Sequence, residues 1–176
     1  QLAPSCFDRA KFGKKILTFP DRIRLTVEAI ESGKSAMFLG GWYSFTGEQG
    51  KGGWGRTRLA DILPLRCLDY EDLMESTEGF SVEATPPGSK AFLDFDFSHL
   101  PPLLGYNRTL PRPEGQTLLK IKETGDPLLA TMKVGKGQAL AFTSDPAPHW
   151  GCNFIFWDKY QEFWLHSLDL ICLQKD

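Results

Sequence analysis

The sequence has no excess of charge of either sign and no long hydrophobic run. Its 20 Lys and Arg residues are balanced by 22 Asp and Glu residues, for a formal net charge of −2. This balance gives no electrostatic basis for binding nucleic acid or an anionic membrane surface. No apolar stretch approaches the roughly 18 residues that are needed to cross a bilayer. We therefore expect neither nucleic acid nor a membrane among the partners of this chain.

Cysteine is also scarce. Cys6, Cys67, Cys152 and Cys172 are scattered without CxxC spacing, which argues against a zinc ribbon or a redox pair. A hydrophobic fraction of 41% makes disulfides unnecessary for a stable core. The opening residues QLAPSCFDRAKFGKK lack the apolar segment of a secretory signal. We expect a cytoplasmic protein that uses no metal and no cofactor.

Length and patterning predict a single α/β domain over residues 1–176. The segment FPDRIRLTVEAIESGK predicts a helix, with Pro20 in its first turn, Asp21 at the positive end of its dipole and Gly33 as its stop. SAMFLG then predicts a buried strand that ends in a glycine turn. This order is typical of parallel sheets, in which ligands bind at the carboxyl ends of the strands.

The C-terminal part predicts strands followed by a helix. Three strands are expected, in QTLLKIKET, PLLATMKV and QALAFTSD, and Gly135-Lys136-Gly137 between the last two predicts a hairpin turn. The segment FWDKYQEFWLHSLDLICLQ predicts the helix. We expect the apolar side of this helix to consist of Trp157, Tyr160, Trp164, Leu168 and Ile171.

The glycine-rich loop GGWYSFTGEQGKGGWGRT, residues 40–57, is the first candidate site. It contains neither GxxxxGK[ST] nor GxGxxG, so the common phosphate-binding motifs are absent from it. A sharp turn after a strand can also present a nucleophile, and Ser44 is the nearest one, although a serine needs a positioned base. Alternatively, the glycines allow a tight loop in which Trp42, Tyr43 and Phe45 pack over the sheet.

The second candidate is TSDPAPHWG, residues 143–151, at the end of a predicted strand. Asp145 and His149 would lie together there, and an Asp-His pair can orient a general base. The alternative is structural, with Asp145 capping the turn and His149 bonded to nearby backbone. A third polar tip, LLGYNRT, offers Tyr106, Asn107 and Arg108, a combination that suits a carboxylate or phosphate but also an ordinary solvated turn.

Taken in order, GGWYSFTGEQGKGGWGRTRLADILPL, PPLLGYN, GDPLLATMKVGKGQALAFTSDPAPHWG and WDKYQEFW resemble the putative glutamine amidotransferase family. This is a bacterial family of the class I glutamine amidotransferase-like superfamily. The resemblance extends from about Pro20 to Ile171. It implies a flavodoxin-like three-layer sandwich with a C-terminal β-hairpin and helix. It also implies that the glycine-rich loop is the nucleophile turn and that the loop of His149 approaches the same cleft.

Two departures from the family pattern bear on function. Class I amidotransferases carry a Cys in a G-x-C-x-G turn and a His-x-Glu pair, whereas this turn reads GGWYSFTG and Trp150 and Gly151 follow His149. The usual thiolate route for glutamine hydrolysis is therefore not expected. The resemblance also implies roughly another half-domain upstream that supplies the first strands of the sheet, whereas this chain starts just before the helix at Pro20. We therefore expect a fragment, a short member, or a sheet completed in a homo-oligomer.

We therefore expect an amidotransferase-like domain without Cys-dependent glutaminase activity. One alternative is a non-catalytic module that binds a small polar ligand or a protein partner. Another is an amide or ester hydrolase with Ser44 as nucleophile, His149 as base and Asp145 as its orienter, in which backbone amides from Gly41 to Tyr43 stabilise the oxyanion. The residues expected to bind a ligand are Gly41, Trp42, Tyr43, Arg56, Tyr106, Asn107 and Trp150.

Overall fold

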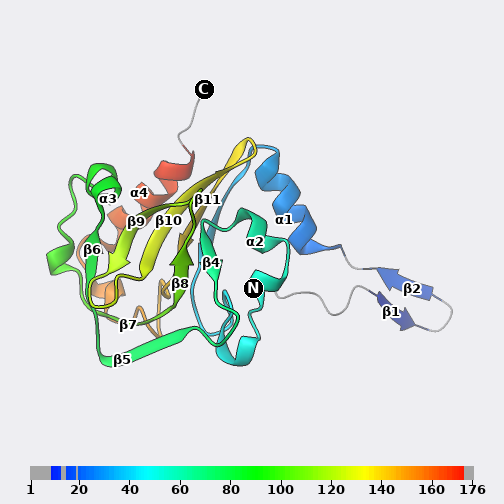
Figure 1. Ribbon diagram of the computed structural model, residues 1–176, viewed down its shortest axis with the longest axis horizontal. Coiled ribbons are helices and arrows are strands. Elements are labelled where there is room, and N and C mark those ends of the chain that lie inside the picture. Colours follow the sequence, from blue (N-terminus) through cyan, green and yellow to red (C-terminus); the bar gives the residue numbers. More distant parts are fainter. Residues whose placement is uncertain (1–8, 13–14, 19, 173–176) are drawn as a thin grey trace.

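The computed structural model describes residues 9–12, 15–18 and 20–172, and their elements are arranged as in Figure 1. The helices are α1 (Arg22–Glu31), α2 (Leu59–Ile62), α3 (Pro86–Ala91) and α4 (Tyr160–Cys172). The strands are β1 (Arg9–Phe12), β2 (Lys15–Thr18), β3 (Ser35–Leu39), β4 (Leu65–Cys67), β5 (Leu73–Phe80), β6 (Val82–Ala84), β7 (Leu103–Asn107), β8 (Thr109–Pro111), β9 (Gln116–Ile121), β10 (Pro127–Val134) and β11 (Gly137–Phe142).

The centre of the molecule is a mixed sheet in the order β3-β11-β10-β9-β6. Only β3 and β11 are parallel, with Phe142 opposite Leu39, and the other neighbours are antiparallel. The three predicted C-terminal strands and the hairpin at Gly135 are confirmed. The α/β class is also confirmed, but the expected parallel sheet is limited to one pair. The reason is that tight turns, which can only reverse the chain, join β9 to β10 and β10 to β11.

Helices cover both faces of this sheet. Alternate residues of its strands lie on opposite faces and belong to two separate hydrophobic cores. On β11, Ala139 and Ala141 belong to the core under α1 and α2, whereas Leu140 and Phe142 belong to the core under α4. This alternation is the period-two pattern of a strand that is buried on both sides. The sheet therefore lies between two helical layers, with α4 and α1 labelled in Figure 1.

Helix α1 confirms the predicted helix and corrects its first turn. Asp21 is the N-cap, and its carboxylate accepts a hydrogen bond from the backbone N–H of Arg24 at 3.1 Å. Pro20 consequently precedes the helix and is not part of its first turn. Gly33 follows the last turn with a φ of +117°, a conformation that favours glycine.

The buried side of α4 agrees in part with the predicted one, since Ile171 is in the core and Tyr160 and Trp164 pack against it. Phe163, Ser167 and Ile171 are buried, whereas Leu168 is 43% exposed. Trp157 is buried but lies before the helix, which begins at Tyr160. The prediction is wrong at Leu168 and omits Phe163 and Ser167, because the helix was expected to begin upstream of Tyr160, which shifted the reference for the helical face.

The described residues contain no helix that is both long and apolar enough to cross a membrane. Cys67, Cys152 and Cys172 are free thiols in this part of the chain. Cys6 lies outside the described residues.

Candidate functional site

Two loops meet where the parallel strands end, because β3 and β11 run side by side in the same direction. The backbone N–H of Gly40 donates to the carbonyl oxygens of Phe142, at 2.8 Å, and Ser144, at 3.1 Å. A β-carbon at Gly40 would lie 2.1 Å from the carbonyl oxygen of Thr143. Only glycine allows the two backbones to approach this closely. The glycine-rich loop and the loop of His149 therefore begin from one fixed junction.

The turn after Gly40 is a tight reversal over Gly41–Ser44. The N–H of Ser44 donates to the carbonyl oxygen of Gly41 at 3.1 Å, and Gly41 has a φ of +140°. Within the described residues, the backbone N–H groups of Trp42 and Tyr43 have no hydrogen-bond partner. Two adjacent free N–H groups in a turn can bind a carbonyl or an anionic oxygen.

A buried polar network beneath this turn fixes its shape. Asn107 accepts a hydrogen bond from the N–H of Gly41 and donates to the carboxylate of Asp72, both at 2.9 Å. The same carboxylate accepts from the N–H groups of Thr46 and Gly47, each at 2.9 Å. Burial raises the pKa of Asp72, and these three donors oppose that rise. The N–H of Gly41 is thus occupied and is not available to stabilise an oxyanion.

A cavity of about 550 Å³ opens between the two loops. It brings together three predicted catalytic residues, Ser44, Asp145 and His149, and three predicted binding residues, Gly41, Trp42 and Tyr43. A β-carbon at Gly41 would lie 3.8 Å from Ser44 Oγ and 3.8 Å from each carboxylate oxygen of Asp145. A hydroxyl and a carboxyl therefore face one point beside the turn.

The imidazole of His149 lies flat on the indole of Trp42 in the wall of this cavity. The ring centroids are 4.6 Å apart and the planes differ by 5°. The indole N–H of Trp42 donates to Oε1 of Glu75 at 3.1 Å, and the indole N–H of Trp150 donates to the same oxygen at 2.7 Å. Glu75 on β5 thereby fixes the indole on which the imidazole stacks.

Asp145 is the acidic group of the cavity. Burial raises the pKa of its carboxyl, while the backbone N–H and the imidazole of His149 act in the opposite direction. The contact with His149 therefore involves its backbone as well as its charge. In a triad, by contrast, the carboxylate would bind the ring N–H and set the tautomer of the base.

The hydrogen bonds of a nucleophile–base pair are not formed in the described part of the chain. The His149 ring has no hydrogen bond to the Ser44 hydroxyl or to the thiol of Cys152, and Cys152 does not line the cavity. The thiol of Cys67 lies elsewhere, and burial raises its pKa to about 12, so it is a poor nucleophile. The described residues also contain no group of three His, Cys, Asp or Glu side chains that could hold a metal.

Four of the predicted binding residues lie away from the cavity. Asn107 is fully buried in the network beneath the turn, and Trp150 is 2% exposed and packs on Gly105. Arg56 is exposed and reaches the carbonyl oxygen of Asp69 at 3.4 Å. The predicted ligand contacts of the LLGYN segment are replaced by internal ones, because β7 is covered by neighbouring elements.

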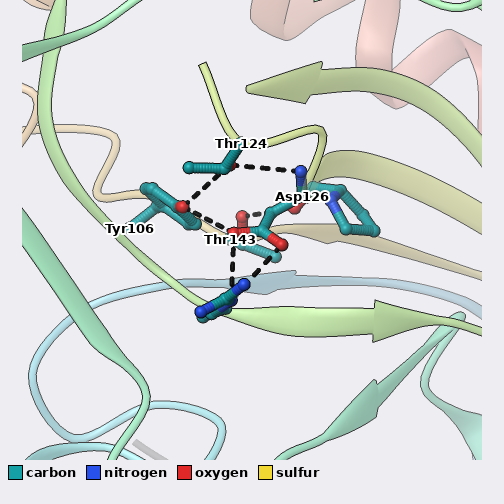
Figure 2. A network of polar contacts seen from close by, with 6 residues as sticks. Tyr106, Thr124, Asp126 and Thr143 are labelled. Atoms are coloured by element: carbon teal, nitrogen blue, oxygen red, sulfur yellow. Dashed lines mark hydrogen bonds and ion pairs between the residues drawn. The ribbon is translucent and has the colours of Figure 1, made fainter. Parts of the chain in front are cut away.

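The fourth, Tyr106, is fully buried in a polar network at the end of the sheet, shown in Figure 2. Its hydroxyl donates to Asp126 Oδ2 at 2.7 Å and lies 3.1 Å from Thr124 Oγ1. Asp126 also pairs with the guanidinium of Arg108 at 3.2 Å. Burial raises the pKa of Tyr106. This network joins β7 to the β9–β10 turn and has a structural role.

Asp72 and Glu75 are site residues that the sequence analysis did not identify. Both lie in EDLMES, residues 71–76, a stretch of mixed polar and apolar residues without a recognisable motif. Their partners are 25 or more residues away, at Gly47, Asn107 and Trp150. No local spacing reveals such contacts, so only the folded chain identifies them.

Comparison with known proteins gives one family match. The family model described as Putative glutamine amidotransferase matches residues 7–173. No curated protein gives a significant match.

Two solved structures from Salmonella are similar over most of the chain. Cytoplasmic protein STM1381 from Salmonella typhimurium LT2 is 35% identical with a TM-score of 0.81, over 89% of this chain and 62% of that protein. Cytoplasmic protein STM3548 from Salmonella typhimurium is 32% identical with a TM-score of 0.81, over 88% of this chain and 61% of that protein. The chain thus spans about three fifths of the length of these relatives.

A more distant likeness concerns the fold alone. The exo-beta-1,4-mannosidase Op5Man5 from Opitutaceae bacterium strain TAV5 is 18% identical, with a TM-score of 0.51 over 92% of this chain and 25% of that enzyme.

Proposed function

Because the chain belongs to the putative glutamine amidotransferase family, we propose that it is an amidotransferase-like domain that binds a small neutral polar molecule without hydrolysing it through a thiolate. The ligand occupies the cavity between the loops after β3 and β11. The cavity volume of about 550 Å³ suits a small molecule, since such sites measure roughly 300–1,000 Å³.

The stacked pair of Trp42 and His149 is the observation that carries this proposal. An imidazole that acts as a general base must reach the hydroxyl that it activates, within about 2.6–3.2 Å. Here no hydrogen bond of the described residues joins the imidazole to Ser44, and the ring is held flat on an indole, with centroids 4.6 Å apart. This arrangement supports a rigid binding wall in preference to a catalytic pair.

The charges of the cavity support a neutral ligand. Among the described residues that line it, Asp145 is acidic, His149 is the only titratable base, and neither Lys nor Arg is present. A phosphate or carboxylate would lack the cation that such anions require. The hydroxyl of Ser44, the carboxyl of Asp145 and the free N–H groups of Trp42 and Tyr43 instead suit hydroxyl or amide groups.

The proposal also covers the fold family, the oligomeric state and the location of the protein. A parallel β3–β11 pair between two helical layers supports assignment to the flavodoxin-like sandwiches. Within the described residues β3 has a strand neighbour on one side only, and since open edges favour pairing, this supports a homo-oligomer. Two relatives named as cytoplasmic proteins support a cytoplasmic location.

Binding and catalysis can be separated in one set of measurements. Isothermal titration with propionamide, which has the side-chain amide of glutamine without its charged groups, D-glucose and inorganic phosphate tests binding. Release of ammonia from L-glutamine, or of p-nitrophenol from its esters, tests hydrolysis. We expect a neutral compound to bind, Trp42→Ala to weaken it at least tenfold, and Tyr70→Ala, an exposed aromatic outside the cavity, to leave it unchanged. Hydrolysis that is abolished in Ser44→Ala or His149→Ala would overturn the proposal, as would preferential binding of phosphate.

A further inference from the structure

A second cavity, of about 330 Å³, lies on the other side of His149. Residues from β5 and β7 line it together with the loop after β11: Glu75, Ser76, Thr77, Leu104, His149 and Trp150. His149 is the residue that it shares with the first cavity. A ligand in the first cavity could therefore extend past the imidazole into the second.

The second cavity repeats the polar groups of the first. The first combines the carboxyl of Asp145, the hydroxyl of Ser44 and the indole of Trp42. The second combines the carboxyl of Glu75 with the hydroxyls of Ser76 and Thr77, while Trp150 is 2% exposed and offers a ligand almost no surface. Matching sets of acceptors and hydroxyls suit a ligand whose own chemistry repeats.

Glu75 is hydrogen-bonded to one lining residue of each cavity and still has a free acceptor oxygen. Its Oε1 takes the indole N–H groups of Trp42, at 3.1 Å, and Trp150, at 2.7 Å. Within the described part of the chain, Oε2 has no hydrogen-bond partner. A carboxylate oxygen with free lone pairs accepts hydrogen bonds from hydroxyl groups of a ligand.

From these observations, and resting on the proposed function, we infer that the second cavity is a subsite for the next unit of an extended glycan. One pyranose ring occupies the first cavity and the linked ring occupies the second, so that the linkage passes over His149. Sugar hydroxyls donate to Asp145 and Glu75, and the apolar face of the first ring packs on the exposed indole of Trp42. A single sugar can fill only one of the two cavities, so a disaccharide gains contacts that a monosaccharide lacks.

The test compares monosaccharides with their dimers on the full chain. Isothermal titration is carried out with D-glucose and cellobiose, and with D-mannose and β-1,4-mannobiose. We expect at least one dimer to bind about tenfold or more tightly than its monomer. Thr77→Trp, which fills the second cavity, removes that gain and leaves monosaccharide binding unchanged. Glu78→Trp is the matched control, since Glu78 is exposed on the same strand but does not line the cavity. Circular dichroism confirms that both variants fold.

The outcomes separate this inference from the proposed function. Equal affinity for monomer and dimer would overturn the second subsite and leave small-ligand binding intact. A gain that survives in Thr77→Trp, or is lost equally in Glu78→Trp, would also overturn it. Binding of propionamide without binding of any of the sugars would overturn the glycan class alone. Failure of every neutral compound to bind would overturn both proposals.

Discussion

The imidazole of His149 stacks face to face on the indole of Trp42, with ring centroids 4.6 Å apart and planes 5° apart. The two residues come from loops that are separated by about a hundred residues in the chain but begin at adjacent strand ends. The stack therefore connects the glycine-rich loop to the loop after β11. It also holds the one lining residue that the two cavities share, since His149 lines both.

The stack should contribute measurably to stability. Aromatic pairs of this kind are worth about 0.5–1.5 kcal/mol beyond the area that they bury. In a double-mutant cycle with Trp42→Ala and His149→Ala, we expect a coupling energy in this range from urea unfolding. Tyr70→Ala combined with His149→Ala is the control pair and should show additive effects. Additive effects in the Trp42 cycle as well would mean that the stack is not an energetic contact.

Protonation of Asp145 should couple stability to pH. Burial raises the pKa of this carboxyl above its ordinary value of 3.8 in the folded state, so the folded protein holds the proton to higher pH than the unfolded chain. Its contribution to stability is therefore greatest below about pH 4 and is lost as pH rises through the folded pKa. Asp145→Asn has no such proton, so its free energy of unfolding should decline less than that of the wild type over this interval. Urea titrations at several pH values measure this difference, and parallel profiles would contradict it.

The local elements of the fold follow from the sequence more readily than the site does. Helix α1 is predictable because Asp21 caps it and Gly33 ends it, and β9, β10 and β11 are predictable from apolar runs separated by glycine turns. These signals depend on residues that are close together in the sequence. The mixture of parallel and antiparallel strands in the sheet is harder to predict from the sequence, because it depends on which strands become neighbours after the chain has folded.

The candidate site is predictable only in part, for the same reason. Ser44, Asp145 and His149 were expected at strand ends, and the structure places all three in one cavity. Glu75 and Asp72 could not be identified, because each acts through partners that are remote in sequence. The sequence likewise contains no signal that the polar tip at Asn107 turns inward to support the loop.

Asn107 should be a major determinant of the shape of the glycine-rich loop. Its amide connects the N–H of Gly41 to the carboxylate of Asp72, and all three groups are buried. Asn107→Ala leaves a buried N–H and a buried carboxylate each short of a partner, which typically costs about 1–3 kcal/mol per group. We expect a loss of about 2–4 kcal/mol in the free energy of unfolding. Asn153→Ala, an exposed asparagine whose side chain caps no helix, should change it by less than about 0.5 kcal/mol.

A small loss in Asn107→Ala would indicate that water replaces the amide. Asn107→Asp distinguishes this case, because a second carboxylate beside Asp72 is disfavoured even when water can enter. Its destabilisation should therefore be larger at pH 7 than at pH 4.

The junction at Gly40 should tolerate no side chain. A β-carbon there would lie 2.1 Å from the carbonyl oxygen of Thr143 and 2.9 Å from the backbone nitrogen of Ser144. Since both obstacles are backbone atoms, β3 and β11 would have to separate at the site where the two loops begin. We expect Gly40→Ala to destabilise the fold by about 3 kcal/mol or more, at the upper end of overpacking effects.

Gly125→Ala is the matched control, because Gly125 has a φ of +78° but nothing within 4 Å of an added β-carbon. It should cost only about 1–2 kcal/mol of backbone strain. Since Gly40 itself is not at a positive φ, a loss in Gly40→Ala no larger than that in Gly125→Ala, measured by urea unfolding, would show that the close approach of the two backbones costs little to relieve.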